Sequence, residues 1–88
     1  MGFEWDEEKE RRNIERHGID FSDAAEIVLA VGYDRRSDRH GEVRWCKTGE
    51  FDGKLWTVVY TKRSQNIRII TTRRAWKNEE RSYRSIHS

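Results

Sequence analysis

The second half of the chain carries the pattern that most constrains the fold, two strand-like segments joined by a very short turn. Residues 43–51 and 54–62 are rich in β-branched and aromatic side chains, and they flank the dipeptide Asp52-Gly53. Asp-Gly is favoured in two-residue hairpin turns because both central residues adopt positive φ. Such a turn fixes the register, with Phe51 opposite Lys54. The sequence therefore predicts an antiparallel hairpin at the centre of the fold.

A third antiparallel strand is predicted over residues 67–74, after a turn at residues 63–66. If that turn has two or four residues, Arg68 lies opposite Thr61 and Arg44 lies on the other side of Thr61, so two arginines flank a threonine on one face of the sheet. A turn of odd length would move Arg68 to the other face. Such a row needs an anion or a buried acid beside it. The opposite face is apolar enough to pack against helices and carries Val43, Trp45, Phe51, Trp56, Val58, Tyr60, Ile67 and Ile69.

The first half of the chain predicts two helices. Asp6 is a candidate N-cap for a polar helix that runs to His17 and ends before Gly18, with Ile14 as its only strong apolar anchor. A stripe of Lys9, Asn13 and His17 lies along one side of that helix. The second helix is expected to begin at an N-cap Ser22 and to end at Gly32.

The remaining segments complete the expected fold. Phe3 and Trp5 are predicted to form an edge strand or a staple, residues 33–41 a loop or irregular strand, and residues 76–85 a final helix. The chain has 88 residues, no proline and no internal repeat, so residues 1–88 are expected to form one domain. We predict an α+β fold, with two N-terminal helices and one C-terminal helix around a mainly antiparallel sheet.

Composition excludes several classes of protein. The sequence has no run of about 18 apolar residues and no apolar signal segment after Met1, so we expect a cytoplasmic protein without a membrane span. One cysteine, Cys46, and three scattered histidines make a poor metal site, so no metal and no cofactor are expected. No phosphate-binding glycine loop, nucleophile elbow or metalloprotease signature is present.

The charge distribution favours an anionic partner. Residues 1–32 carry four basic and nine acidic side chains, a net −5, whereas residues 33–88 carry fourteen basic and seven acidic side chains, a net +7. Attraction between the two halves of one fold is an alternative explanation. In the second half the cations are interleaved with aromatic residues, which suits phosphates and unstacked bases of nucleic acid. These cations are Lys62, Arg63, Arg68, Arg73, Arg74, Lys77, Arg81 and Arg84.

A set of motifs along nearly the whole chain resembles the BrnT-type toxins. The matching residues are Phe3, Trp5-Asp6, Lys9, Asn13, His17-Gly18-Ile19, Phe21, Ala24, Glu42-Val43-Arg44-Trp45, Gly49, Asp52-Gly53, Val58-Val59-Tyr60-Thr61, Ile67-Arg68-Ile69-Ile70, Arg73-Arg74-Ala75, Glu80-Arg81 and Tyr83. Thr71 departs from the pattern, because the family usually has serine there.

The resemblance implies a type II toxin, a small ribonuclease that inhibits translation and has a fold similar to RelE-type ribonucleases. It also implies a cognate antitoxin with a ribbon-helix-helix DNA-binding domain, so that the toxin reaches operator DNA only through its antitoxin. The expected partners are thus the antitoxin and an RNA substrate. Cleavage of RNA through its own 2′-hydroxyl requires a base, a cation at phosphorus and an acid for the leaving oxygen, and it requires no metal.

Arginine is the natural candidate for the cation, because a guanidinium group matches two phosphate oxygens at once. Arg68 is the preferred clamp, and its structural alternative is a salt bridge to an acid on the first or last helix. Arg73 is a second candidate, although the parity of a regular strand places it on the opposite face. Both arginines serve one site only if that site lies near a sheet edge or the strand bulges.

The other candidates have weaker support from spacing alone. Lys9 is a second cation or general acid, or else a solvated helix lysine, and His17 is a proton carrier or a histidine that binds carbonyls near Gly18. Glu42 is a general base, or the partner of a nearby arginine. The remaining candidates are expected to bind RNA and are Arg44, Arg63 and Arg74. The leading hypothesis is a metal-independent endoribonuclease, and the alternatives are a non-catalytic nucleic-acid- or antitoxin-binding module and a plain structural subunit.

Overall fold

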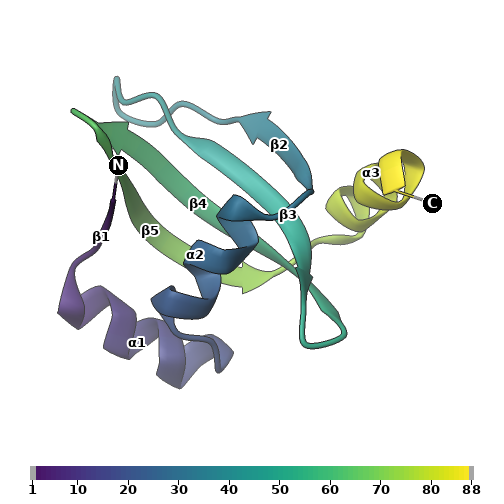
Figure 1. Ribbon diagram of the computed structural model, residues 1–88, viewed down its shortest axis with the longest axis horizontal. Coiled ribbons are helices and arrows are strands. Elements are labelled where there is room, and N and C mark those ends of the chain that lie inside the picture. Colours follow the sequence, from purple (N-terminus) through teal and green to yellow (C-terminus); the bar gives the residue numbers. More distant parts are fainter. Residues whose placement is uncertain (1, 88) are drawn as a thin grey trace.

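Five strands form a single sheet in the order β1-β5-β4-β3-β2 (Figure 1). The computed structural model describes residues 2–87. The strands are β1 (Phe3–Glu4), β2 (Tyr33–Arg36), β3 (Trp45–Phe51), β4 (Lys54–Arg63) and β5 (Asn66–Arg74), and the helices are α1 (Glu7–His17), α2 (Phe21–Leu29) and α3 (Lys77–His87). Only the β1–β5 pair is parallel among the pairings of these strands. The predicted α+β class and mainly antiparallel sheet are confirmed.

The registers of both hairpins agree with the sequence. Phe51 pairs with Lys54 across the Asp52-Gly53 turn, and both turn residues have positive φ. Thr61 pairs with Arg68 across the second turn. Arg44 lies one residue before β3, outside the paired strands, so the expected row of two arginines around a threonine is not completed.

A β-bulge interrupts the pairing of β4 and β5. Tyr60 pairs with Ile69. The residue before it in β4, Val59, pairs with Thr71, which leaves Ile70 as an extra residue in β5. An extra residue reverses the alternation of side chains beyond it. Arg73 therefore lies on the same face as Arg68, and the expectation of opposite faces, which assumed a regular strand, is wrong.

Helices α1 and α2 cover one face of the sheet, and α3 lies at one end against β2 and β3 (Figure 1). The core under α2 joins apolar side chains of the helices to the face predicted to be apolar, and it consists of Ile19, Phe21, Ala24, Ile27, Trp56, Val58 and Ile69. Gly49 lies directly under α2, where a Cβ atom would come within 3.0 Å of the Ile27 side chain. The helices of residues 2–87 include none that is long and apolar enough to cross a membrane.

The ends of α1 were predicted correctly, but its anchor was not. The Asp6 side chain accepts hydrogen bonds from two backbone N–H groups of the first turn, and Gly18 ends the helix with φ of 77°. Ile14 is 45% exposed, whereas the neighbouring Asn13 is only 5% exposed. The amide of Asn13 is buried because it bonds to the edge of β5, as described below.

Three further boundaries differ from the sequence-based expectation. The N-cap of α2 is Asp20 rather than Ser22, because its carboxylate accepts the N–H of Asp23. The same helix ends at Leu29, before Gly32. Residues 33–36, expected in a loop or irregular strand, form the edge strand β2, and the last helix covers Lys77–His87 rather than residues 76–85.

Candidate functional site

Two pockets meet at the β-bulge of β5. The first, which we call the sheet pocket, has a volume of about 270 Å³ and lies on the face of the sheet opposite α2. The second, the helix pocket, has a volume of about 230 Å³ and lies between α1 and β5. Ile70 and Thr71 line both pockets, so the bulge forms the boundary that the pockets share.

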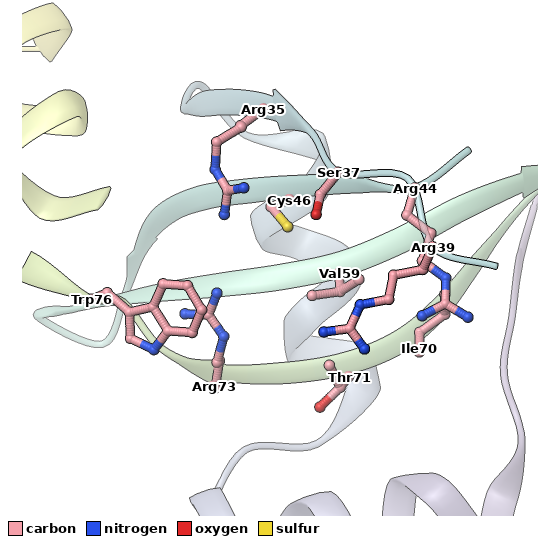
Figure 2. A pocket seen from close by; sticks show the side chains of 10 residues that line it. All are labelled: Arg35, Ser37, Arg39, Arg44, Cys46, Val59, Ile70, Thr71, Arg73 and Trp76. Atoms are coloured by element: carbon pink, nitrogen blue, oxygen red, sulfur yellow. The ribbon is translucent and has the colours of Figure 1, made fainter. Parts of the chain in front are cut away.

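The sheet pocket has an apolar floor surrounded by arginines. Cys46 of β3, Val59 of β4 and Ile70 of β5 form the floor. Figure 2 shows the arginine side chains arranged around these strands, with Trp76 at the end near α3. The polar and aromatic residues of the wall are Arg35, Ser37, Arg39, Arg44, Thr71, Arg73 and Trp76.

Glu79 holds two of these arginines in place. Its carboxylate accepts both terminal nitrogens of Arg73, with Nη1 to Oε1 at 2.8 Å and Nη2 to Oε2 at 2.9 Å, and Nη2 of Arg35 at 3.0 Å. It also accepts the hydroxyl of Thr57 and the backbone N–H of Trp76. Burial alone would raise the pKa of Glu79, which is 2% exposed, but these hydrogen bonds outweigh it and hold the pKa at about 2.

Arg73 is also stacked on an aromatic ring. Its Cζ atom lies 3.6 Å from the centroid of the Trp76 ring, and its side chain is 17% exposed. Two bonds to Glu79 and the stack on Trp76 fix the guanidinium in one orientation. The site thus presents a positioned guanidinium at the wall of a pocket.

The helix pocket is lined by one face of α1. Its α1 residues are Lys9, Arg12, Asn13, Arg16 and His17. In residues 2–87, no ion pair joins Lys9, Arg12 or Arg16 to a carboxylate. Burial lowers the pKa of His17, and the positive charges of Arg16 and Arg73 lower it further. His17 is therefore neutral at pH 7 and able to accept a proton.

Asn13 connects this face of α1 to the bulge. Its Oδ1 accepts the Thr71 hydroxyl at 2.9 Å and the Thr72 backbone N–H at 3.0 Å. Its Nδ2 donates to the carbonyl of Ile19 at 3.2 Å. The Asn13 side chain thereby gives a hydrogen-bond acceptor to a β5 backbone N–H that β1 is too short to reach. It also fixes Thr71 between the two pockets.

The structure brings four of the predicted site residues to these pockets. Lys9 and His17 line the helix pocket, and Arg44 and Arg73 line the sheet pocket. Arg68 lines neither pocket and forms a salt bridge with Glu4 at 2.9 Å, so its acid lies on β1 and not on a helix. A salt bridge to an acid was the alternative to a phosphate-binding role for Arg68.

The other predicted residues lie outside both pockets. Glu42 binds Arg44 at 2.9 Å and Arg63 at 3.5 Å, and the hydrogen bond from Arg44 is the main cause of its lowered pKa. A lowered pKa makes a carboxylate a weaker base. Arg74 lies on the α2 side of the sheet, where its Nε donates to the Leu55 carbonyl at 3.4 Å.

Several lining residues were not predicted. Arg12 and Arg16 share a helix face with Lys9 and His17, so helical spacing was sufficient to find them. Arg35 and Arg39 lie in a segment expected to be a loop or irregular strand. Glu79 was missed because two of its partners, Arg35 and Thr57, lie 44 and 22 positions away in the sequence. In residues 2–87 no group of three His, Cys, Asp or Glu side chains is placed to hold a metal ion.

Comparison with known proteins agrees with the motifs. The model of the family described as "Ribonuclease toxin, BrnT, of type II toxin-antitoxin system" matches residues 5–79, which include α1, the whole bulged sheet from β2 to β5, and Glu79. None of the curated proteins compared with the chain matches it. Because the match covers most of the chain and contains all the lining residues of both pockets, this protein belongs to the BrnT family of ribonuclease toxins of type II toxin–antitoxin systems.

Proposed function

We propose that this toxin is a metal-independent endoribonuclease whose active site is the boundary between the sheet pocket and the helix pocket. The observation that carries the proposal is the meeting of two cationic pockets at Thr71. A strand of RNA laid across the bulge would have its phosphates close to cations on both sides. Cations supplied by side chains stabilise the charge that develops on phosphorus, which is the role a metal ion has in other nucleases.

Three side chains supply the three requirements of cleavage through the 2′-hydroxyl. Neutral His17 accepts the proton of the 2′-hydroxyl, and the 2′-oxygen then attacks the adjacent phosphorus. Arg73 holds the phosphate oxygens as negative charge develops on them. The bond from phosphorus to the 5′-oxygen breaks, and Lys9 donates a proton to that oxygen. The products are a 2′,3′-cyclic phosphate and a 5′-hydroxyl.

The lining of the two pockets favours Arg73 over Arg68 as the phosphate clamp. The two arginines share a face, but Arg68 is occupied by Glu4 and lies outside both pockets. Arg73 is also paired, with Glu79, but unlike Arg68 it lines the sheet pocket, which shares Thr71 with the helix pocket. Similarly, Glu42 is engaged with two arginines, so His17 is the better candidate for the base.

The proposed cellular role rests on the family and on the positive charge of the two pockets. We propose that cleavage of RNA inhibits translation, and that the cognate antitoxin neutralises the toxin by covering the two pockets with an acidic segment. The resemblance to BrnT-type toxins supports a ribbon-helix-helix domain in that antitoxin, so that the complex reaches operator DNA through the antitoxin alone. A complex in which both pockets remain open would contradict this mode of neutralisation.

The test uses purified toxin and a defined single-stranded RNA in the presence of EDTA. We expect cleavage to continue without divalent metal, and each upstream fragment to end in a 2′,3′-cyclic phosphate. A strand with 2′-deoxyribose at the cleaved position should resist cleavage there. If EDTA abolishes cleavage, the metal-independent mechanism is wrong. Binding of RNA without cleavage under all conditions would instead favour a non-catalytic binding module.

A further inference from the structure

Trp76 is a large exposed aromatic residue at the wall of the sheet pocket. It is 55% exposed and immediately precedes α3. Arg73 covers one face of the indole at 3.6 Å, so the exposed area belongs to the opposite face and to the ring edge. Figure 2 shows the ring beside Arg73 at one end of the pocket. An indole held in this way offers a flat surface on which another ring can stack.

The floor of the sheet pocket is also better suited to a base than to a phosphate. Cys46, Val59 and Ile70 present apolar atoms, which give no stabilisation to a phosphate but pack against the face of a ring. Donors on the rim, from Ser37 and Arg39, are suited to the carbonyl oxygens and ring nitrogens of a base edge. The volume of about 270 Å³ is small, as expected for one base rather than a larger ligand.

The aromatic surface is rigid before any ligand binds. Glu79 accepts the backbone N–H of Trp76 at 2.8 Å and also holds the guanidinium of Arg73 under the ring. One buried carboxylate therefore fixes both the main chain that carries the indole and the cation stacked on it. A surface fixed in advance loses little conformational entropy when a ligand stacks on it.

We infer that the sheet pocket binds one unpaired nucleobase of the RNA strand, stacked on the free face of Trp76. This inference rests on the proposed ribonuclease function, because it places the base next to the phosphate that Arg73 holds. A base in a duplex is stacked on both sides and has no face to offer, so the pocket selects single-stranded RNA. Trp76 is a substrate-binding residue that determines where the strand is positioned.

The experiment measures binding of a short fluorescent oligonucleotide that cannot be cleaved because every 2′-hydroxyl is methylated. Single abasic sites are introduced at successive positions, so that one base at a time is missing while every phosphate remains. For the wild type we expect one position at which loss of the base weakens binding by roughly tenfold. Trp76→Ala should bind the intact strand as weakly as the abasic one, whereas Trp76→Phe, which keeps an aromatic face, should retain part of the difference.

Trp45→Ala is the matched control, because it removes an indole that lies outside both pockets. It should behave like the wild type. Equal binding of every abasic strand by the wild type would overturn the inference, as would a difference that survives in Trp76→Ala. Nucleoside monophosphates are added as competitors in parallel, and displacement of the strand by them at lower concentrations than by unlabelled strand would assign the pocket to a free nucleotide and overturn it too.

The same proteins are assayed for cleavage of unmodified RNA, which separates the two proposals. Cleavage without any dependence on a base would refute the base pocket and leave the ribonuclease mechanism standing. Base-dependent binding without cleavage would support the pocket and refute the proposed catalysis.

Discussion

Glu79 is the residue on which the geometry of the sheet pocket most depends. Its carboxylate is almost fully buried and forms salt bridges with both Arg73 and Arg35, so the cluster of three keeps a net positive charge. The charged form is favoured because five hydrogen bonds converge on the two oxygens. Removing one partner from a buried charge cluster is strongly destabilising, since it leaves other charges without a counter-ion.

We predict that Glu79→Gln destabilises the protein at pH 7 by about 3 kcal/mol. This free energy corresponds to the lowering of the Glu79 pKa from 4.5 to about 2 on folding. The folded pKa lies below the unfolded one, so this stability is fully present above pH 4.5 and is lost as the pH falls toward 2. The difference between wild type and variant should therefore narrow across that window, as measured by urea unfolding at pH 7 and pH 3. A difference that does not change with pH would show that the charge of Glu79 is not the stabilising feature.

His17 provides the corresponding test of chemistry. Because burial and nearby cations lower its pKa from 6.5, the neutral base should persist to a pH below 6.5. We predict that the cleavage rate is constant from pH 8 down to about 6.5 and falls at lower pH as His17 becomes protonated. His17→Gln should be slower by about 100-fold or more and should lose this acid limb. An unchanged acid limb in His17→Gln would assign the base to another residue.

At the scale of single residues, the sequence was informative about which residues line the pockets and about one ion pair, that of Glu42 with the nearby Arg44, but not about ion pairs between distant segments. Lys9, His17, Arg44 and Arg73 were predicted and do line the two pockets. Which arginine is engaged by which acid depends on contacts between distant segments, such as Glu4 with Arg68 across 64 positions. No local pattern contains that information, and the same holds for the bonds of Glu79 to Arg35 and Thr57.

Among the elements, α1 and β5 form the contact on which the helix pocket depends. The contact is polar, through the buried amide of Asn13, and not apolar through Ile14 as its sequence suggested. A low apolar content in α1 therefore does not mean that the helix is loosely attached. Its buried hydrogen bonds replace the apolar stripe that a surface helix normally presents to the core.

We predict that Asn13→Ala destabilises the protein by roughly 1–3 kcal/mol, because the buried Thr72 N–H loses its acceptor. Ile14→Ala, on the exposed side of the same helix, should cost less than about 1 kcal/mol. Urea unfolding of both variants gives the comparison directly. The opposite order would mean that α1 is held by its apolar side chain after all.

The elements of the sheet were the most predictable part of the fold. The two-residue turn sets the register of β3 and β4 through the φ angles that it requires, and this information is local. The bulge at Ile70 is different. An extra residue in β5 has no signature in a run of β-branched side chains, so the face of Arg73 depended on a feature that the sequence left open.

At the scale of the whole molecule, the cations of the sheet pocket and the helix pocket come from both halves of the chain. The net charges of −5 for residues 1–32 and +7 for residues 33–88 indicated that only the second half binds an anion. In the fold, however, one face of the acidic first half contributes Lys9, Arg12 and Arg16 to the helix pocket. The charge asymmetry predicts an anionic partner, and the tertiary structure adds that α1 supplies cations to the helix pocket.

We propose that RNA is cleaved at the bulge, with Arg73 and not Arg68 at the phosphate. The most direct measurement is induced expression of wild type, Arg73→Lys, Arg73→Ala and Arg68→Ala in cells, with growth, total RNA and the level of folded toxin followed together. Arg73→Lys keeps a positive charge beside Glu79 but loses the two-pronged geometry of the guanidinium. We predict that wild type and Arg68→Ala arrest growth and fragment RNA, and that neither Arg73 variant does so. Arg73→Lys should accumulate as folded protein, whereas Arg73→Ala, which removes the bidentate partner of the buried Glu79, should accumulate less. Continued RNA fragmentation by the Arg73 variants, with loss of it in Arg68→Ala, would contradict the account.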